Sequence, residues 1–208
     1  MIIYSQLYIY MTKRIQLSPQ LFFTLMLFFL LSGSGVNAQS LVLKSSTVTI
    51  HGETNVNHDY TTKATKVSGK MTVVGNSPKS LEVEIPVRSI LSGERLMDKK
   101  THETFNESKN PTIRFSMTKL NSLQVNGDDL AVAVTGDLSM AGATKEVTLT
   151  AKGKELSPGV YTFEGSLPLK MTDYNMKPPT AMLGTMKTKD PILVKYQVTF
   201  EGPAGQFN

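Results

Sequence analysis

Residues 129–152 contain the pattern that most restricts the fold of this chain. Their sequence, DLAVAVTGDLSMAGATKEVTLTAK, alternates apolar and polar residues on both sides of a Gly-containing turn at residues 140–144. One parity holds Leu130, Val132, Val134, Gly136 and Leu138 before the turn and Val147, Leu149 and Ala151 after it. A repeat of two residues is typical of a strand with one buried face, whereas an amphipathic helix repeats every 3.6 residues. We therefore predict a hairpin with a five-residue turn, which needs further antiparallel strands to cover its edges and its apolar face.

The same alternation recurs along most of the chain. Further strands are predicted at residues 46–53, 65–74, 81–88, 113–117, 161–169 and 192–200. One short helix is expected at residues 99–106, capped by Asp98 and ended by Pro111, and it should lie over an open end of the sheet. About eight or nine strands without regular strand-helix alternation predict an all-β antiparallel barrel or sandwich. We favour the barrel because closure removes the free edges of the sheet.

Residues 1–38 have the composition of a leader rather than of a folded domain. Two basic residues precede an apolar run at residues 21–31, and small residues follow it up to Ala38. This order is typical of a secretory signal peptide. We predict cleavage after Ala38, which leaves residues 39–208 as the barrel domain. An uncleaved membrane anchor is the less favoured alternative, because a span needs roughly 20 apolar residues.

Charge and cysteine content narrow the class of protein. The formal net charge is +5, and loss of Lys13 and Arg14 with the leader lowers it by two. The remaining lysines are scattered rather than gathered in a stripe, so no nucleic-acid partner is expected. Cysteine is absent, which excludes disulfides, thiolate metal ligands, a cysteine nucleophile and lipid attachment to cysteine. We expect a periplasmic or otherwise exported protein that is soluble after cleavage of the leader.

The sequence offers few groups for catalysis. His58 and Asp59 lie in a segment rich in turn-forming residues, and we interpret them as turn residues rather than as a catalytic pair. His102 and Glu103 lack the H-E-x-x-H spacing of a zinc site, because residue 106 is Asn. The strand carboxylates that alternate with apolar neighbours, and should point outward, are Glu82, Glu84, Asp137 and Glu146. We therefore expect no enzyme activity, no metal site and no cofactor.

Five segments between residues 52 and 184 follow one another in a distinctive order. They are GETNVNHDY at 52–60, IPVRSILSGERLMDKK at 85–100, NPTIRF at 110–115, VTGDLSMAGATKEV at 134–147 and DYNMKPPTAMLG at 173–184. In this order and spacing they resemble the motifs of the YceI-like family of exported proteins, over about residues 45–201. The chain departs from the family pattern at Asn55, where Ser is usual, and at Tyr60, where Trp is usual. Both departures concern packing at one end of the barrel.

The resemblance implies an eight-stranded lipocalin-like β-barrel with one short helix. It also implies an apolar interior that holds the tail of an isoprenoid or another long-chain amphiphilic lipid. The side chains that we expect at this lipid-binding site are Phe105, Ile113, Phe115, Phe163, Leu167, Tyr174, Met176 and Met182. Methionine side chains adapt to an irregular tail, although for any single one the filling of a gap in the core is the favoured interpretation. Transient membrane contact and a homodimer are compatible with this function.

A second hypothesis is a filled barrel that acts as a protein-interaction or stress-protective module. The fold alone does not decide, because eight strands make a barrel whose interior is either filled by side chains or holds one small ligand. If there is a ligand, the free energies of burial and association favour one with a long tail. Each buried methylene contributes roughly 0.8 kcal/mol, whereas association costs on the order of 4 to 15 kcal/mol. A ligand without strong polar anchors therefore needs about ten or more buried carbons.

Overall fold

The computed structural model describes residues 38–56 and 59–207, without the side chains of Ala181 and Met182. Residues 1–37 of the predicted signal peptide lie outside this description, so the leader and its cleavage stay predictions. His58, which we interpret as a turn residue, also lies outside it. Among the described residues, no helix is both long enough and apolar enough to cross a membrane.

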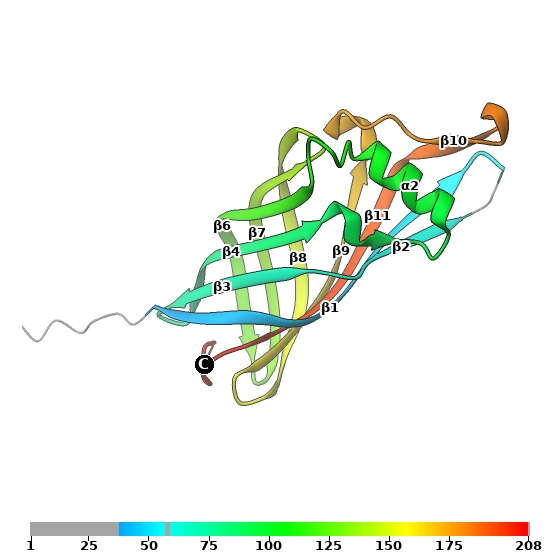
Figure 1. Ribbon diagram of the computed structural model, residues 1–208. Helices are drawn as coiled ribbons and strands as arrows, with labels where there is room; N and C mark the ends of the chain where they lie inside the picture. The colour runs from blue at the N-terminus through cyan, green and yellow to red at the C-terminus, as the bar shows by residue number, and fades with distance from the viewer. Residues whose placement is uncertain (1–37, 57–58, 208) are drawn as a thin grey trace, which may run out of the picture. The chain divides into compact units, whose positions relative to one another are not determined.

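Eight long antiparallel strands close into a barrel (Figure 1). They are β1 (Gln39–Thr54), β3 (Ser68–Val74), β4 (Ser77–Pro86), β6 (Thr112–Asn126), β7 (Asp129–Met140), β8 (Ala143–Ser157), β9 (Val160–Lys170) and β11 (Met186–Glu201). Neighbours follow the order β11-β9-β8-β7-β6-β4-β3-β1, and β1 pairs again with β11 to complete the circle. The predicted all-β antiparallel eight-stranded barrel is confirmed. Closure leaves most of the backbone hydrogen-bonding groups of these strands paired with a neighbour.

Shorter elements gather near one end of the barrel (Figure 1). They are β2 (Tyr60–Ala64), the 3-10 turn η1 (Val87–Ser89), β5 (Ile90–Leu91), the helix α2 (Arg95–Thr104), the 3-10 turns η2 (Met171–Tyr174) and η3 (Met182–Gly184), and β10 (Thr180–Ala181). β2 pairs with the second half of β1, and β5 pairs with β2. These pairings extend the wall toward α2.

The helix begins earlier than the sequence suggests. It spans Arg95–Thr104 rather than residues 99–106, and Glu94 is its N-cap residue. The carboxylate of Asp98 does not cap the helix. It accepts hydrogen bonds from the backbone N–H of Ser92 at 2.6 Å and from the Ser92 hydroxyl at 2.7 Å. Asp98 therefore ties the preceding loop to the first helical turn, where its negative charge also suits the helix dipole.

The turn of the central hairpin is tighter than predicted. β7 ends at Met140 and β8 begins at Ala143, so two residues make the connection instead of five. Ala141 has φ 51° and Gly142 has φ 82°. Positive φ at both central positions is typical of a type I′ turn, whose twist matches that of the flanking strands. Gly142 suits this conformation because it lacks a Cβ atom.

Register shifts adjust which side chains point into the barrel. The pairing of β1 with β11 slips between Leu43 and Ser45. As a result, odd-numbered Leu41 and Leu43 and even-numbered Val48 and Ile50 all pack against the two apolar clusters of the core. A bulge adds one residue to one strand and so reverses the parity of the residues after it. The alternation therefore continues across the whole of β1 although it changes phase.

Candidate ligand cavity in the barrel

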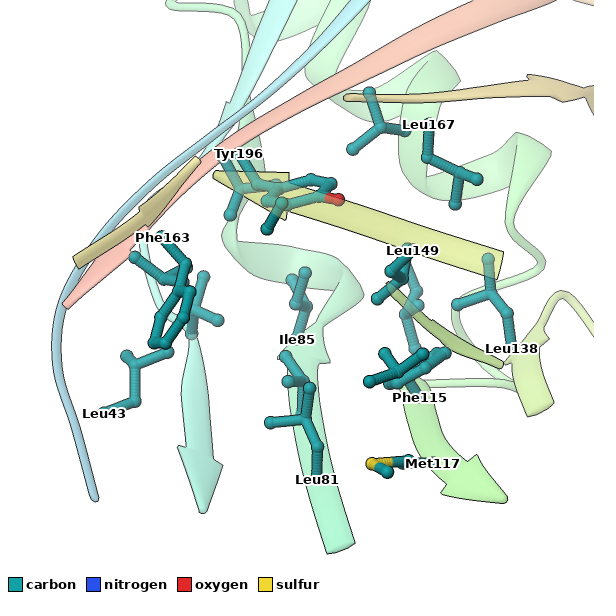
Figure 2. A pocket seen from close by; sticks show the side chains of 18 of the residues that line it. Leu43, Leu81, Ile85, Phe115, Met117, Leu138, Leu149, Phe163, Leu167 and Tyr196 are labelled. Atoms are coloured by element: carbon teal, nitrogen blue, oxygen red, sulfur yellow. The ribbon is translucent and has the colours of Figure 1, made fainter. Parts of the chain in front are cut away.

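The barrel encloses a cavity of about 190 Å³. Every one of the eight strands contributes apolar side chains to its wall, and the other lining residues are Ala64, Val67, Ile90, Phe105 from the segment after α2 and Phe207 near the C-terminus. Figure 2 shows Leu81, Ile85, Phe115 and Leu149 among these side chains. Among the described residues that line the cavity, the hydroxyl of Tyr196 is the only side-chain group with oxygen or nitrogen. The interior therefore offers hydrocarbon surface on all sides.

A second space of about 350 Å³ lies beneath α2. It shares Ile50, Phe105 and Ile192 with the cavity, so these three side chains lie where the two spaces adjoin. We call this second space the mouth. Its wall mixes apolar and polar side chains, including Leu96, Met97, Lys100, Thr101 and Thr104 from α2, and Met176, Pro179, Thr180, Met186 and Thr188 from the facing segment. The mouth is thus amphiphilic where the cavity is apolar.

Tyr60 stands in the wall of the mouth, where the family pattern usually has Trp. Its ring packs over Gly52 of β1, and a Cβ atom at Gly52 would overlap the ring and its hydroxyl. Burial raises the pKa of Tyr60 above its ordinary value, and the hydroxyl hydrogen-bonds the side chain of Thr188. The departure to Tyr therefore keeps an aromatic ring at this position and gives it a polar partner.

The far end of the barrel is closed by the chain after β11. Phe207 is 4% exposed, and its ring meets that of Tyr161 edge-on with centroids 5.0 Å apart. It also meets Phe163 edge-on at 6.4 Å, and Phe163 meets Phe200 at the same separation. Edge-to-face contacts of this kind are favourable because the positive edge of one ring faces the negative face of another. These aromatic side chains separate the cavity from solvent at this end.

The wall has a seam between β8 and β9. Their pairing runs from Ser157 and Val160 up to Ala151 and Gly165 and stops there, although both strands continue. At this point the Tyr196 hydroxyl of β11 donates a hydrogen bond of 2.8 Å to the Thr150 carbonyl. Burial raises the pKa of Tyr196 to about 12. Tyr196 therefore bridges the place where the two strands separate, and its ring lies across the interior in Figure 2.

A family model for the YceI-like domain matches residues 40–200 of this chain. The chain belongs to the YceI-like family. The matched region contains all eight barrel strands except the first residue of β1 and the last residue of β11. The resemblance of the five sequence segments to this family is thereby confirmed.

Curated relatives match part of the chain. A UPF0312 protein of Pseudomonas aeruginosa strain LESB58 is 36% identical over 108 residues, which are 49% of this chain and 54% of the relative. A UPF0312 protein of Pseudomonas paraeruginosa is 35% identical over the same length. The match thus spans about half the length of the curated relatives.

Solved structures with low sequence identity share the YceI-like fold. A polyisoprenoid binding domain from Saccharophagus degradans, implicated in plant cell wall breakdown, has a TM-score of 0.63 at 13% identity and covers 80% of this chain and 100% of that domain. BcnA of Burkholderia cenocepacia has a TM-score of 0.61 at 20% identity, covering 74% of this chain and 95% of its own. The YCEI protein of Campylobacter jejuni reaches 0.55 at 19% identity, covering 69% and 85%. At these identities the likeness concerns the fold.

The structure brings most of the predicted site residues of this YceI-like chain together. The five that line the cavity are Phe105, Ile113, Phe115, Phe163 and Leu167. Met176 lines the mouth, as Phe105 also does. Tyr174 is 1% exposed but borders neither space. The side chain of Met182 lies outside the described part. That any of these side chains contacts a lipid stays a prediction.

Several cavity residues were absent from the predicted set. Tyr196 lies on the apolar face that the alternation at residues 192–200 identifies, so its inward position could be inferred although its bond to Thr150 could not. Leu149 and Leu138 follow from the central hairpin in the same way. Phe207 lies beyond the last strand, where no periodic pattern indicates that it folds back into the barrel.

The histidines that the structure describes lie away from the cavity wall. His51 is hydrogen-bonded between the hydroxyls of Thr49 and Thr61, at 2.9 and 3.0 Å. The Nε2 atom of His102 lies 2.9 Å from the carbonyl oxygen of Ile90, to which it donates. In residues 38–56 and 59–207, no three His, Asp or Glu side chains are grouped closely enough to hold a metal ion. These imidazoles bond to neighbouring residues and do not line the barrel cavity.

Proposed function

We propose that this YceI-like protein is a non-enzymatic binding protein that holds the tail of a long-chain amphiphilic lipid, with an isoprenoid as the leading candidate. One observation carries the proposal. The cavity is walled by hydrocarbon from all eight barrel strands, and it adjoins an amphiphilic mouth at Ile50, Phe105 and Ile192. An amphiphile has the same division, because its tail is apolar and its head group is polar. The tail would lie in the barrel and the head group at the mouth.

The sizes of the two spaces support a long ligand. Small-molecule sites in proteins usually measure about 300–1,000 Å³. The cavity of about 190 Å³ falls below that range, but the cavity and the mouth of about 350 Å³ together fall within it. A tail that extends through both spaces can bury the roughly ten or more carbons needed to offset the cost of association.

The comparison with a solved structure supports an isoprenoid among the long-chain lipids. The domain from Saccharophagus degradans that shares this fold is described as polyisoprenoid binding. Isoprene units carry methyl branches at regular intervals, and the side chains around the cavity are largely branched or aromatic. Straight acyl chains are the comparison ligands in the test below.

The nearly complete lack of polar groups among the described side chains of the cavity wall supports binding rather than catalysis. General acid or base catalysis needs a titratable group within hydrogen-bond reach of the reacting atoms. Of the described side chains around the cavity, only Tyr196 can ionise, its pKa is raised to about 12, and its proton is already donated to Thr150. The leader-like composition of residues 1–38 supports an exported, periplasmic location.

The deciding experiment is to identify what the protein carries. Protein expressed with its leader and purified without detergent should yield a long-chain lipid on organic extraction and mass spectrometry. The emptied protein should then bind a fluorescent prenyl analogue, and unlabelled isoprenoids should displace the analogue more effectively than acyl chains of equal carbon number. Repeated failure to extract any lipid, together with failure of the analogue to bind, would remove this function.

A filled barrel that binds protein partners is the second candidate, and one observation favours it. Phe115, Phe163 and Tyr196 project into the interior, as Figure 2 shows, and they leave a cavity smaller than most ligand sites. The substitution Phe163→Ala separates the two functions. In a packed core it should cost about 3–5 kcal/mol of unfolding free energy. In the wall of a ligand cavity it should cost less and should change the affinity for the prenyl analogue instead.

A further inference from the structure

The mouth and the aromatic end of the barrel lie at opposite ends of the same strands. Tyr161 and Phe163 stand near the beginning of β9, whereas Met171, immediately after its last residue, lines the mouth. A strand rises roughly 3.3 Å per residue, so these two ends of β9 are roughly 30 Å apart. Figure 1 shows the C-terminus at the end of the barrel opposite α2. A tail that enters at the mouth would therefore meet Phe207 last.

The segment that carries Phe207 is fixed in place by hydrogen bonds to the barrel. The Gly202 N–H donates to the Gly159 carbonyl at 3.0 Å, and the Gln206 N–H donates to the Tyr161 hydroxyl at 3.0 Å. The side-chain amide of Gln206 donates to the side-chain oxygen of Gln39 in β1. Gln206 is buried, with 3% of its surface exposed. The segment is therefore attached to β9 and to β1, on two sides of the barrel opening.

The position of Phe207 gives it two roles in the packing. Its ring contacts Tyr161, and Phe207 belongs to the apolar cluster that contains Leu41 and Leu130. The ring is also part of the cavity wall, together with Phe163 and Phe200. Neither Tyr161 nor Leu130 lines the cavity. Phe207 thus separates the open part of the interior from a packed layer.

We propose that Phe207 forms the floor of the cavity and sets the length of the lipid tail that the barrel can bury. This inference rests on the proposed function. A tail gains affinity with each carbon that it places inside the cavity, by up to about fourfold per methylene, because a buried methylene contributes roughly 0.8 kcal/mol. Carbons added after the tail has reached Phe207 remain at the mouth. Affinity should therefore rise with chain length and then reach a plateau.

The plateau can be measured with graded series of prenyl alcohols and straight-chain alcohols. Each alcohol competes with the fluorescent prenyl analogue for the emptied protein. In the variant Phe207→Ala the floor recedes toward Tyr161, so the plateau should move to chains a few carbons longer. The Phe207→Ala variant should bind an alcohol of the new plateau length about tenfold more tightly than it binds an alcohol of the wild-type plateau length. Two further buried methylenes give about this factor.

A matched control separates the length of the cavity from the stability of the protein. Leu130→Ala truncates a buried side chain of the same apolar cluster that does not line the cavity. This variant should unfold at a lower temperature but keep the wild-type plateau. If Phe207→Ala fails to fold, Phe207→Leu makes a smaller change in the same direction, and its plateau should move by a smaller number of carbons.

The outcomes distinguish this inference from the function on which it rests. A plateau that moves to longer chains in the Phe207 variants, and not in Leu130→Ala, supports it. Wild-type protein that binds the alcohols with a plateau unchanged by the Phe207 variants overturns the floor while the proposed function stands. Wild-type protein that binds none of the alcohols overturns both.

Discussion

The hydroxyl of Tyr196 in β11 donates a 2.8 Å hydrogen bond to the carbonyl of Thr150 in β8, across the intervening strand β9. The ring can pass over β9 because residue 165, its pairing partner there, is glycine. The bond lies where the pairing of β8 and β9 stops. A backbone carbonyl that has lost its strand partner is thereby satisfied by a side chain from two strands away. The barrel remains closed although one strand pair is incomplete.

Tyr196→Phe should lower the stability of the protein modestly. The substitution removes the hydroxyl and leaves the Thr150 carbonyl without this donor, while the ring still lines the cavity. A hydrogen bond of this kind contributes about 0.5–1.5 kcal/mol, and we expect a loss of unfolding free energy in that range. Urea denaturation followed by circular dichroism measures it. No loss at all would show that water replaces the hydroxyl at the seam.

Tyr174→Phe is the matched comparison, and it should raise the unfolding free energy where Tyr196→Phe lowers it. The Tyr174 side chain is 1% exposed, and its hydroxyl has no hydrogen-bond partner among the described residues. A buried polar group without a partner costs free energy, so its removal should raise the unfolding free energy by about 1 kcal/mol. The same denaturation experiment tests this. A loss as large as that of Tyr196→Phe would contradict the isolation of this hydroxyl.

The raised pKa of Tyr196 predicts a loss of stability at alkaline pH. Its folded-state pKa is about 12, above the ordinary value of 10.0. Between pH 10 and 12 the unfolded chain loses the proton while the folded protein keeps it, so the unfolded state gains relative stability. The stability that Tyr196 contributes through this pKa difference is therefore fully present below pH 10 and is lost as the pH rises through 12.

The measurement is the unfolding free energy of the wild type and of Tyr196→Phe at several pH values across this window. Wild-type stability should fall more steeply, because the variant lacks one of the groups that titrate. The variant should still lose some stability, since burial also raises the pKa of Tyr60, Tyr161 and Tyr174. Equal slopes for the two proteins would show that Tyr196 ionises without a shift.

Much of the fold could be predicted from the sequence because one buried face imposes a repeat of two residues on each strand. The central hairpin and the terminal strand β11 both follow this rule over most of their length. The rule is local, however, and it does not reveal where the register slips. The slip between Leu43 and Ser45 changes the phase of β1, so the sequence pattern marks only the part of the strand after it. Likewise, the starting residue of α2 depends on the loop held by Asp98.

The candidate site was less predictable than the fold. Phe115 and Phe163 could be assigned to the interior because each lies on the apolar parity of a strand. Tyr174 and Met176 lie where the alternation has ended, and only one of them borders either space. Phe207 reaches the cavity because Gln206 bonds Tyr161 and Gln39, contacts between residues far apart in the sequence. Such contacts leave no periodic signal.

Gly165→Ala should destabilise the barrel at the seam. A Cβ atom at residue 165 would overlap both the Thr150 carbonyl oxygen and the Tyr196 hydroxyl, so the methyl group and the hydrogen bond cannot occupy the same space. Glycine elsewhere in a strand usually gains stability on substitution, because alanine restricts the unfolded chain. Here the overlap with a backbone atom should outweigh that gain, and we expect a loss of about 1–3 kcal/mol, typical of overpacking.

Gly69→Ala in β3 is the control for this substitution. A Cβ atom there would lie 3.2 Å from the Glu82 carbonyl oxygen and 3.4 Å from a methyl carbon of Leu43, which small shifts can relieve. The change in unfolding free energy should therefore stay within about 1 kcal/mol. If Gly165→Ala proves no more costly than Gly69→Ala, Tyr196 can leave the seam without penalty, and its bond to Thr150 contributes little to closing the wall. If it costs clearly more, residue 165 must be glycine because a Cβ atom there has no room beside the Thr150 carbonyl and the Tyr196 hydroxyl that bonds it.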